Sequence, residues 1–277
     1  MRLKRISARR RWSLVGATLL ALGCGVTDDQ EVSLGQQTAR EMNARLPLVT
    51  DPRVTDYVTH LGMAIARTTS RADLDWKFYV VNTPDVNAFA LPGGFIYVNR
   101  GLIERTQRLD QLAGTLGHEI GHVVRRHSVE QMKKASGANA GIALVCTLTS
   151  LCDSRASRVV INVAGSALFA KYSRTDEAEA DSEAVVNVIR AGIDPDGVPE
   201  LFEVLLRERQ RNPNALDGFF ASHPFEEDRV AHTRDLIAQY DQHRLEGLTS
   251  DDPNYAAFKR ELAALPMPRP RPLPRAP

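Results

Sequence analysis

The pentapeptide HEIGH at residues 118–122 constrains this chain more than any other feature of its sequence. A helix turns by about 100° per residue, so side chains four positions apart lie about 40° from each other. The imidazoles of His118 and His122 then face one point, and Glu119 projects beside them. The opposite arc of this helix is apolar and predicts a packing face; it carries Leu116, Ile120, Val123 and Val124.

Two imidazoles one helical turn apart form a common zinc-binding pair, and a Glu beside the first can act as the general base of a metalloprotease. We therefore expect His118 and His122 to bind one Zn²⁺ per chain and Glu119 to activate the attacking water. On one continuous helix, His127 would lie about 180° from His118, so we interpret His127 as structural.

A catalytic zinc usually takes three protein ligands. The pattern H-x-x-G-x-x-H, which would supply a third histidine, is missing because Arg125 stands at the Gly position. The segment SRTDEAEAD at residues 173–181 offers carboxylates instead. Glu177 and Asp181 share one helical face, whereas Glu179 lies about 200° round from Glu177. We predict that Glu177 is the third ligand and that Asp181 accepts a hydrogen bond from a ligand imidazole. The alternative is a solvated acidic face.

The fold class follows from hydrophobic periodicity. Apolar spacing of three and four predicts helices over 30–46, 52–68, 110–134 with Asp110 as its cap, 168–191, 197–211 and 225–243. From Trp76 to Val98, short β-branched and aromatic runs separated by Pro, Gly and Asn predict a small meander or hairpin of strands. We expect a mostly α fold with a small β-sheet (α+β), in which the HEIGH helix packs against a second ligand-bearing helix.

The N-terminus predicts export. Residues 1–23 join a basic stretch to a short apolar run, which is typical of a signal peptide and too short to span a bilayer. The segment ALGC resembles a lipoprotein cleavage site, so we expect a lipid on Cys24, with an ordinary secretory signal as the alternative. No Asp follows Cys24. We therefore expect a periplasmic protein anchored to the outer membrane through Cys24.

The rest of the chain divides into four parts. Residues 24–29 form a short linker, residues 30–245 a zinc metallopeptidase domain, residues 246–265 a partly helical C-terminal extension, and residues 266–277 a Pro/Arg tail that we expect to be disordered. In an oxidising periplasm, Cys146 and Cys152 form a plausible disulfide; the alternative is two apolar side chains on a buried helix. The surrounding residues 136–170 predict packed core helices or a flap over the site.

The charge distribution argues against nucleic acid as a partner. The formal net charge is +1, but nine Lys and Arg residues and no acidic residues lie in the two terminal segments, 1–23 and 266–277. Without those nine, the body of the chain has a charge of −8. It contains no basic stripe of the kind that binds phosphates.

Over residues 30 to 240, the chain resembles the metallopeptidase family that includes the CAAX prenyl endopeptidase, bacterial HtpX and the mitochondrial Oma-type protease. The resemblance is carried by EVSLGQQTAREM, NAFALPGGFIYVNRGLI, HEIGHVVRRHS, YSRTDEAEAD, AGIDPDGVPELFEVL and SHPFEEDR, in unbroken order. It implies a gluzincin-like fold in which Glu177 ligates zinc and Asp181 supports the ligands. The membrane helices usual in that family are not evident, which favours its soluble or lipid-anchored periplasmic members.

The same resemblance implies further site residues. His223, followed by Pro224 and Arg229, would stabilise the transition state or act as a regulatory fourth ligand, and either His223 or Arg229 would stabilise the oxyanion. Gluzincins place an edge strand at a similar point in the sequence. This implies that Asn87, Ala88 and Phe89, or the neighbouring FIYV, pair with an extended peptide substrate.

Two functions remain open from the sequence. The first is a zinc endopeptidase that cleaves unfolded or misassembled envelope proteins. The second is a chaperone-like binding protein for outer-membrane assembly, with its site latched by His223 or covered by residues 136–170. An aminopeptidase is disfavoured, because Glu177 lies 55 residues past His122 and no motif for an α-amino group is apparent.

Overall fold

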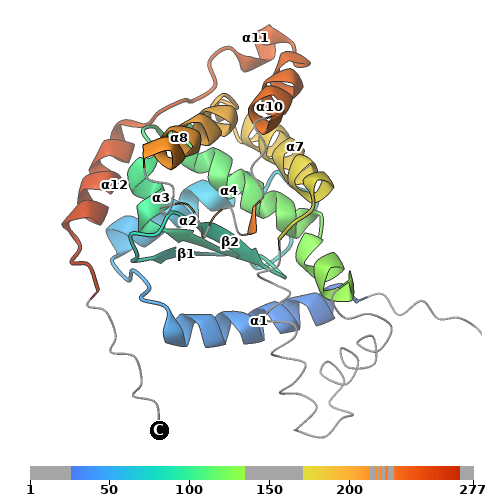
Figure 1. Ribbon diagram of the computed structural model, residues 1–277, viewed down its shortest axis with the longest axis vertical. Helices are drawn as coiled ribbons and strands as arrows, with labels where there is room; N and C mark the ends of the chain where they lie inside the picture. The colour runs from blue at the N-terminus through green and yellow to red at the C-terminus, as the bar shows by residue number, and fades with distance from the viewer. Residues whose placement is uncertain are drawn as a thin grey trace, which may run out of the picture.

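The computed structural model describes residues 26–134, 171–211, 216, 219, 222–223 and 228–268. These residues form helices around one three-stranded sheet, so the predicted α+β class is confirmed (Figure 1). The predicted signal segment 1–23, the predicted lipidation site Cys24, the predicted disulfide partners Cys146 and Cys152, and residues 269–277 of the predicted tail lie outside the described part of the chain.

The first two helices begin at local capping signals. Helix α1 (Asp28–Arg45) starts at a capping box, in which Thr27 accepts a hydrogen bond from the backbone of Gln30 and the Gln30 side chain accepts one from the Thr27 backbone. Helix α2 (Pro52–Ala66) starts at Asp51, with proline at its first position. Both confirm predicted helices.

The sheet has the order β1-β3-β2, with β1 spanning Lys77–Val81, β2 Ala88–Leu91 and β3 Phe95–Asn99. Strands β2 and β3 form the predicted hairpin around Gly93 and Gly94, whose positive φ angles of 79° and 98° suit a residue without a side chain. Strand β1 pairs with β3 in parallel. Of the two predicted alternatives, the hairpin is confirmed for β2 and β3, and a meander of all three strands is excluded, because residue type indicates where strands lie and not which strands pair.

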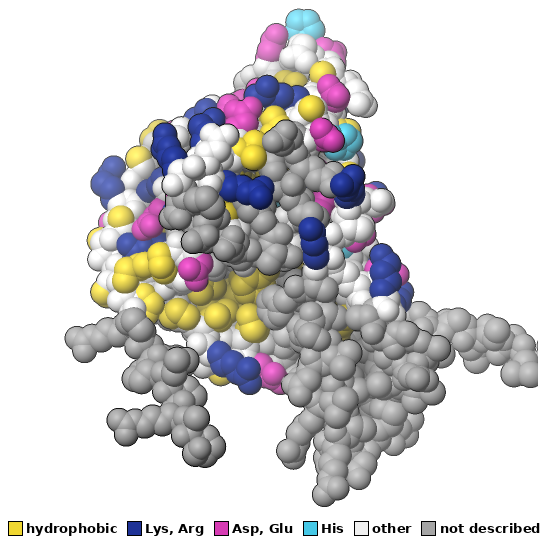
Figure 2. All heavy atoms as spheres, viewed as in Figure 1, with side chains coloured by type: hydrophobic (Ala, Val, Ile, Leu, Met, Phe, Trp, Pro, Cys, Tyr) yellow, Lys and Arg dark blue, Asp and Glu magenta, His cyan; other side chains and the backbone are white. Residues whose placement is uncertain are grey.

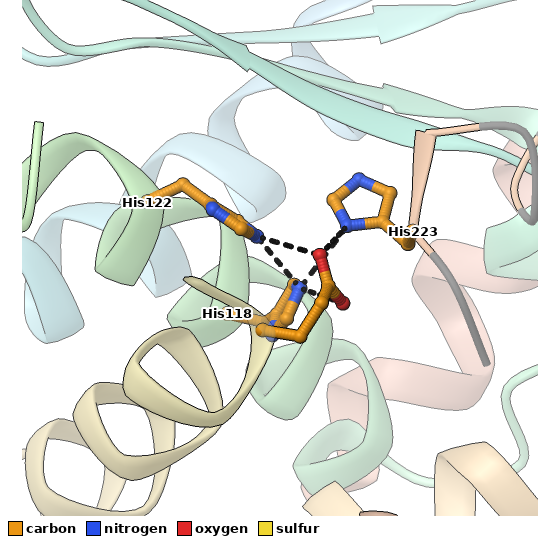
Figure 3. A group of neighbouring side chains, drawn as sticks. His118, His122 and His223 are labelled. Carbon is orange, nitrogen blue, oxygen red and sulfur yellow. Dashed lines mark hydrogen bonds and ion pairs between the residues drawn. The ribbon is translucent and has the colours of Figure 1, made fainter. Parts of the chain in front are cut away.

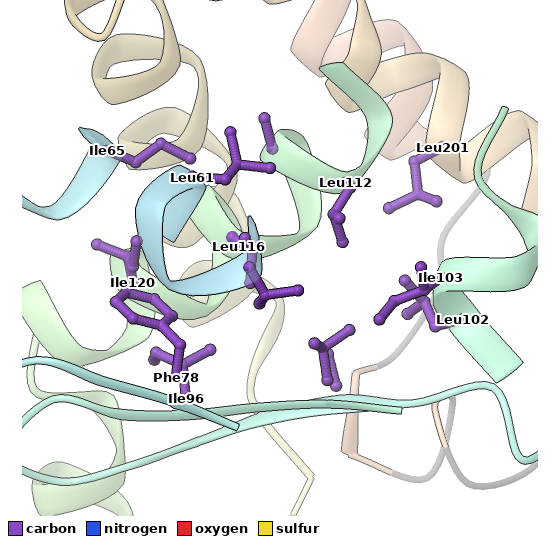
Figure 4. Packing of buried hydrophobic residues seen from close by; sticks show 14 of the residues in the cluster. Leu61, Ile65, Phe78, Ile96, Leu102, Ile103, Leu112, Leu116, Ile120 and Leu201 are labelled. Carbon is purple, nitrogen blue, oxygen red and sulfur yellow. The ribbon is translucent and has the colours of Figure 1, made fainter. Parts of the chain in front are cut away.

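The sheet separates two apolar layers. On one side α1 packs against β2 and β3, and α2 and α4 (Leu109–Val124) lie on the other side (Figure 1). Tyr97 of β3 belongs to the apolar cluster on the α1 side, whereas Ile96 and Val98 belong to the cluster that includes α2 and α4. The larger core lies between the sheet and the helices, where the fully buried Leu116 and Ile120 of α4 meet Ile65 and Ile96 (Figure 4). The predicted packing face of α4 is thus confirmed, and it holds α4 against the sheet.

Helix α4 differs from the single helix predicted over residues 110–134. It ends at Val124, Arg126 takes a positive φ of 60°, and a second helical segment covers residues 127–134. Asp110 is also not the cap: Arg108 occupies that position, and Asp251 accepts the backbone hydrogen bond of Leu109. Apolar periodicity did not reveal either detail, because tertiary contacts supply both.

The remaining helices are α3 (Arg100–Arg105), α7 (Arg174–Arg190), α8 (Gly197–Arg211), α10 (Asp228–Ala238), α11 (Gln242–Leu245) and α12 (Pro253–Ala264). Of these, α7 and α8 pack on α4, and α10 packs on α7 and α8. The helix predicted over residues 225–243 is two helices, α10 and α11. Helix α12 packs on α2 and α3, and its Tyr255, Phe258 and Leu262 are buried in the larger core.

Among the described helices, none is both long enough and apolar enough to cross a bilayer. On the face seen in Figure 2, Lys and Arg side chains alternate with Asp and Glu over the helices and do not gather in one basic patch.

Candidate functional site

Helices α4 and α7 approach each other closely because two glycines of α4 face α7. A Cβ atom on Gly121 would lie 2.8 Å from the carbonyl oxygen of Ala180, and one on Gly117 would lie 3.3 Å from the Cα of Ala184. The absence of side chains at these positions lets the backbones approach at the level of the HEIGH motif. This close contact brings the two histidines of α4 and the acidic segment of α7 to one buried point.

Four side chains converge there: His118 and His122 from α4, Glu177 from α7, and His223 (Figure 3). One donor atom from each lies within 4.8 Å of the others. The Nε2 atoms of His118 and His122 are 3.0 Å apart, and Nδ1 of His223 lies 3.3 Å from Nε2 of His118. Oε1 of Glu177 lies 3.0 Å from Nδ1 of His223 and 3.5 Å from Nε2 of His122.

These distances fit a divalent cation. Ligand bonds of about 2.0–2.1 Å in tetrahedral geometry place neighbouring donor atoms roughly 3.3 Å apart. The spacings of 3.0 to 3.5 Å between the donor atoms of His118, His122, Glu177 and His223 lie close to that value. The structure therefore brings the three predicted ligands together and adds His223 at a fourth position.

His118 is held by a buried ion network. Its Nδ1 lies 2.8 Å from Oδ1 of Asp181, the arrangement expected for an imidazole that donates a hydrogen bond to a carboxylate and directs the lone pair of Nε2 at the metal. Arg229 donates to both oxygens of Asp181 at 2.8 and 2.7 Å, and its third nitrogen lies 2.6 Å from Glu177. Arg229 thus supports two carboxylates, and its role at an oxyanion stays a prediction.

His122 has a support that the sequence analysis missed. Its Nδ1 lies 2.8 Å from Nδ1 of His127, and the ring of Tyr172 stacks on the His122 ring with centroids 3.9 Å apart. The interpretation of His127 as structural assumes one continuous helix, on which it would lie opposite His118; the helix breaks at Arg126, and His127 instead turns towards His122. Tyr172 directly precedes Ser173, the N-cap of α7. This place next to the ligand-bearing helix was the one sequence signal that could have indicated that Tyr172 lies near the site.

Glu119 lies beside the ligands and is 1% exposed. Neither of its carboxylate oxygens has a hydrogen-bond partner among the described residues, although Oε1 lies 3.5 Å from Nε2 of His223. Burial raises the pKa of Glu119 above its ordinary value, in spite of the nearby histidines. A buried carboxylate without a hydrogen-bond partner, next to a metal site, has the position and basicity that a general base requires.

The remaining pKa shifts match the charges that each group faces. Burial lowers the pKa of His122 well below its usual range, which favours the neutral form that binds metals. Burial raises the pKa of Glu177 and Asp181, but nearby His223 and Arg229, respectively, outweigh it and leave both values lowered. Burial lowers the pKa of His223, but the carboxylates of Glu177 and Glu119 raise it overall.

The predicted peptide-binding residues lie at the edge strand β2. Ala88 is fully buried and belongs to the core that includes α4, whereas Phe89 stacks on Tyr97 in the layer that faces α1. The Phe89 side chain therefore points away from the metal site, and only its backbone is available to a peptide there. Asn87 accepts a backbone hydrogen bond from Asn99, and the Oδ1 atom of Asn87 is buried without a partner among the described residues.

Comparison with known proteins agrees with this geometry. The model of Peptidase family M48 matches residues 52–237. The beta-barrel assembly-enhancing protease of Escherichia coli O157:H7 is 29% identical over 224 residues, which cover 78% of this chain and 46% of that protein. Metalloprotease YcaL of Escherichia coli (strain K12) is 34% identical, covering 64% of this chain and 68% of its own length. The mitochondrial metalloendopeptidase OMA1 of Schizosaccharomyces pombe is 30% identical, covering 63% of this chain and 50% of its own length.

The chain spans about half the length of the assembly-enhancing proteases that it matches. The family match covers both ligand-bearing helices, α4 and α7, and the metalloprotease names of the relatives agree with the clustered histidines and carboxylates. This chain therefore belongs to Peptidase family M48.

Proposed function

We propose that this chain is a zinc-dependent endopeptidase that cleaves extended segments of unfolded or misassembled envelope proteins. The observation that carries the proposal is the convergence of His118, His122 and Glu177 beside the buried carboxylate of Glu119, whose oxygens have no hydrogen-bond partner among the described residues. Two imidazoles and one carboxylate are the ligand set of many catalytic zinc sites. When bound, zinc polarises a scissile carbonyl and lowers the pKa of the water that it ligates.

The chain's own residues supply the proton transfers. Glu119 accepts the proton of the attacking water and passes it to the leaving amine, and its raised pKa suits both steps because the two forms then differ less in free energy near neutral pH. Nε2 of His223 lies 3.5 Å from Glu119 and faces the same space. In this proposal, His223 donates a hydrogen bond to the developing oxyanion, and Arg229 holds the two supporting carboxylates in place.

The edge position of β2 supports an extended substrate. Strand β3 lies on one side of β2 and β1 lies beyond β3, so the other edge of β2 is not paired in the three-stranded sheet. Helix α4, which carries His118 and His122, packs against β2, and this contact supports a peptide site beside the ligands. A peptide that pairs with the backbone of residues 87–89 would lie across the site, and backbone pairing favours unfolded segments over folded ones.

Location and substrates extend the proposal. The N-terminal pattern predicts export and lipidation of Cys24, which would anchor the enzyme at the outer membrane on its periplasmic side. Relatives named as beta-barrel assembly-enhancing proteases support a substrate class among envelope proteins. We propose envelope protein quality control on these grounds.

Substitution of the base tests the enzymatic proposal. Glu119→Gln should retain one zinc per chain, because Glu119 is not a ligand, but lower the cleavage of casein by about 10²–10⁴-fold. Glu130→Gln, which changes an exposed side chain on the segment 127–134, serves as the matched control and should cleave at the wild-type rate. Cleavage by Glu119→Gln at a rate within threefold of wild type would reject Glu119 as the base.

A chaperone-like function is the second candidate, and the fourth position of His223 is the observation that favours it. With Nδ1 of His223 3.0 Å from Glu177 and 3.3 Å from His118, His223 can complete the coordination and close the site to water. Complementation separates the two functions. Full rescue of envelope integrity by Glu119→Gln in a deletion strain would show that the cellular role does not depend on proteolysis.

A further inference from the structure

The ring of His122 is fixed on two sides by residues outside the ligand set. Its Nε2 faces the other ligands, its Nδ1 lies 2.8 Å from Nδ1 of His127, and Tyr172 stacks on its face at an interplanar angle of 21°. His122 is completely buried, and His127 and Tyr172 are 3% and 5% exposed. These contacts leave the His122 imidazole little freedom to rotate.

The hydrogen bond between the two histidines also selects a tautomer. A metal ligand must present the lone pair of His122 Nε2, so its Nδ1 carries the proton and donates it to His127. Nδ1 of His127 is then the acceptor and Nε2 of His127 the donor, and this Nε2 lies 3.4 Å from the carboxylate of Glu179. In this chain from His122 through His127 to Glu179, each hydrogen bond therefore has one donor and one acceptor.

The other ligand histidine, His118, is supported in a different way from His122. His118 donates to Asp181, a carboxylate that Arg229 clamps with two hydrogen bonds, whereas His122 donates to a neutral imidazole. A neutral acceptor polarises the donor ring less than a carboxylate does, so its main effect is on tautomer and direction. The two supports come from different parts of the chain, because Asp181 lies on α7 and His127 follows the break in α4.

The break that directs His127 is itself held in place. Arg126, with a φ of 60°, lies in a backbone region that non-glycine residues seldom adopt. Its side chain donates to the carbonyl of Val26 and forms an ion pair of 2.8 Å with the fully buried Glu31 of α1. Arg71 pairs with the same Glu31 and donates to the carbonyl of Val123 in the last turn of α4. Helix α1 thus fixes the turn that points His127 at His122.

We propose that His127 is a positioning residue of the metal site, which sets the tautomer and the direction of His122 through its Nδ1 acceptor, while Tyr172 fixes the plane of the ring. The proposal rests on the metal site of the proposed function. It predicts that His127 acts on metal affinity and on the geometry of the bound ion, because these depend on how the His122 lone pair is aimed.

Two variants of nearly equal shape separate this role from packing. His127→Asn keeps an acceptor close to the position of Nδ1, and His127→Leu has a similar size without an acceptor. Zinc affinity is measured by competition with a chromophoric chelator, and the coordination geometry by the visible absorption of the Co²⁺-loaded protein. We expect His127→Leu to lose about 10–100-fold in zinc affinity and to shift the Co²⁺ spectrum, and His127→Asn to remain within about threefold of wild type.

His60→Leu, which removes an exposed histidine of α2, is the control and should leave both readouts unchanged. Equal losses in His127→Leu and His127→Asn would indicate packing and overturn the proposal, as would wild-type affinity in His127→Leu. If His127→Leu does not fold, His127→Val, which also lacks an acceptor, takes its place with the same expectations. If the wild-type chain bound neither Zn²⁺ nor Co²⁺, the metal site itself would be rejected. If the wild-type chain bound zinc and His127→Leu bound it equally well, only the positioning role of His127 would be rejected.

Discussion

Replacement of Arg229 by lysine removes the clamp that holds two site carboxylates. Three nitrogens of Arg229 contact Asp181 and Glu177 at 2.6 to 2.8 Å, and the three side chains are between 0% and 8% exposed. A lysine keeps the positive charge but has one ammonium group, which cannot reproduce the bidentate contact and also reach the second carboxylate. At least one buried carboxylate would then lose its charged partner.

The cost can be worked out from this burial. Removal of one partner from a buried ion pair destabilises a protein by about 3–5 kcal/mol. At roughly 2–4 °C per kcal/mol for a folded unit of this size, the melting temperature of Arg229→Lys should fall by about 10 °C. Asp181 also orients His118, so the zinc affinity should fall by about 10–100-fold.

Thermal unfolding in saturating zinc and chelator competition measure the two effects. The control is Arg234→Lys on the same helix, whose side chain is 58% exposed and pairs with Glu203 at the surface. Exposed pairs contribute roughly 0–1 kcal/mol, so this variant should melt close to wild type. If Arg229→Lys loses no more stability than Arg234→Lys, the guanidinium does not hold the site and the reasoning fails.

Two further substitutions test the fold around the site. A Cβ on Gly35 of α1 would lie 1.8 Å from the carbonyl oxygen of Pro92, so Gly35→Ala should destabilise the protein by about 1–3 kcal/mol in urea unfolding, whereas the exposed Gln36→Ala should not. Burial raises the pKa of Asp110 from 3.8 to about 6, so the folded state holds this proton more tightly than the unfolded state, and stability falls as pH rises from about 4 to 6. Asp110→Asn lacks this fall, and its stability relative to wild type should rise by up to about 3 kcal/mol over that range; equal pH profiles would contradict the shift.

Much of the fold and the ligand set could be predicted because both depend on local pattern. Helical spacing alone placed His118 and His122 on one face, and the same rule separated Glu177 and Asp181 from Glu179, which lies 42% exposed in the structure. The pairing of β1 with β3 could not be predicted, because it depends on how the chain crosses between strands. The contacts of residues near the site could likewise not be predicted wherever the backbone departs from regular helical geometry.

His127 shows how such a departure hides a contact. The helical rule placed it opposite His118, and the rule would hold on a continuous helix. One residue, Arg126, takes a left-handed conformation, and its ion pair with Glu31 involves a residue 95 positions earlier in the chain. A positive φ at one residue changes the direction of every later side chain. The assumption of a continuous helix through Arg126 therefore gave the wrong neighbours for His127.

Charge explains why these buried groups can coexist. Glu119, Glu177 and Asp181 are each at most 1% exposed, and Arg229 is the one guanidinium that the described residues place among them. Three carboxylates against one guanidinium leave two negative charges in a region of low dielectric, where an unbalanced charge is costly. A divalent cation held by His118, His122 and Glu177 would balance those two charges. Burial raises the pKa of Glu119, and the carboxylates of Glu177 and Glu119 raise the pKa of His223 against the effect of its burial; a proton on either group also lowers the negative charge. We therefore expect metal binding and folding to be coupled through this balance, in which Arg229 supports Glu177 and Asp181 and a bound cation would add to the support of Glu177.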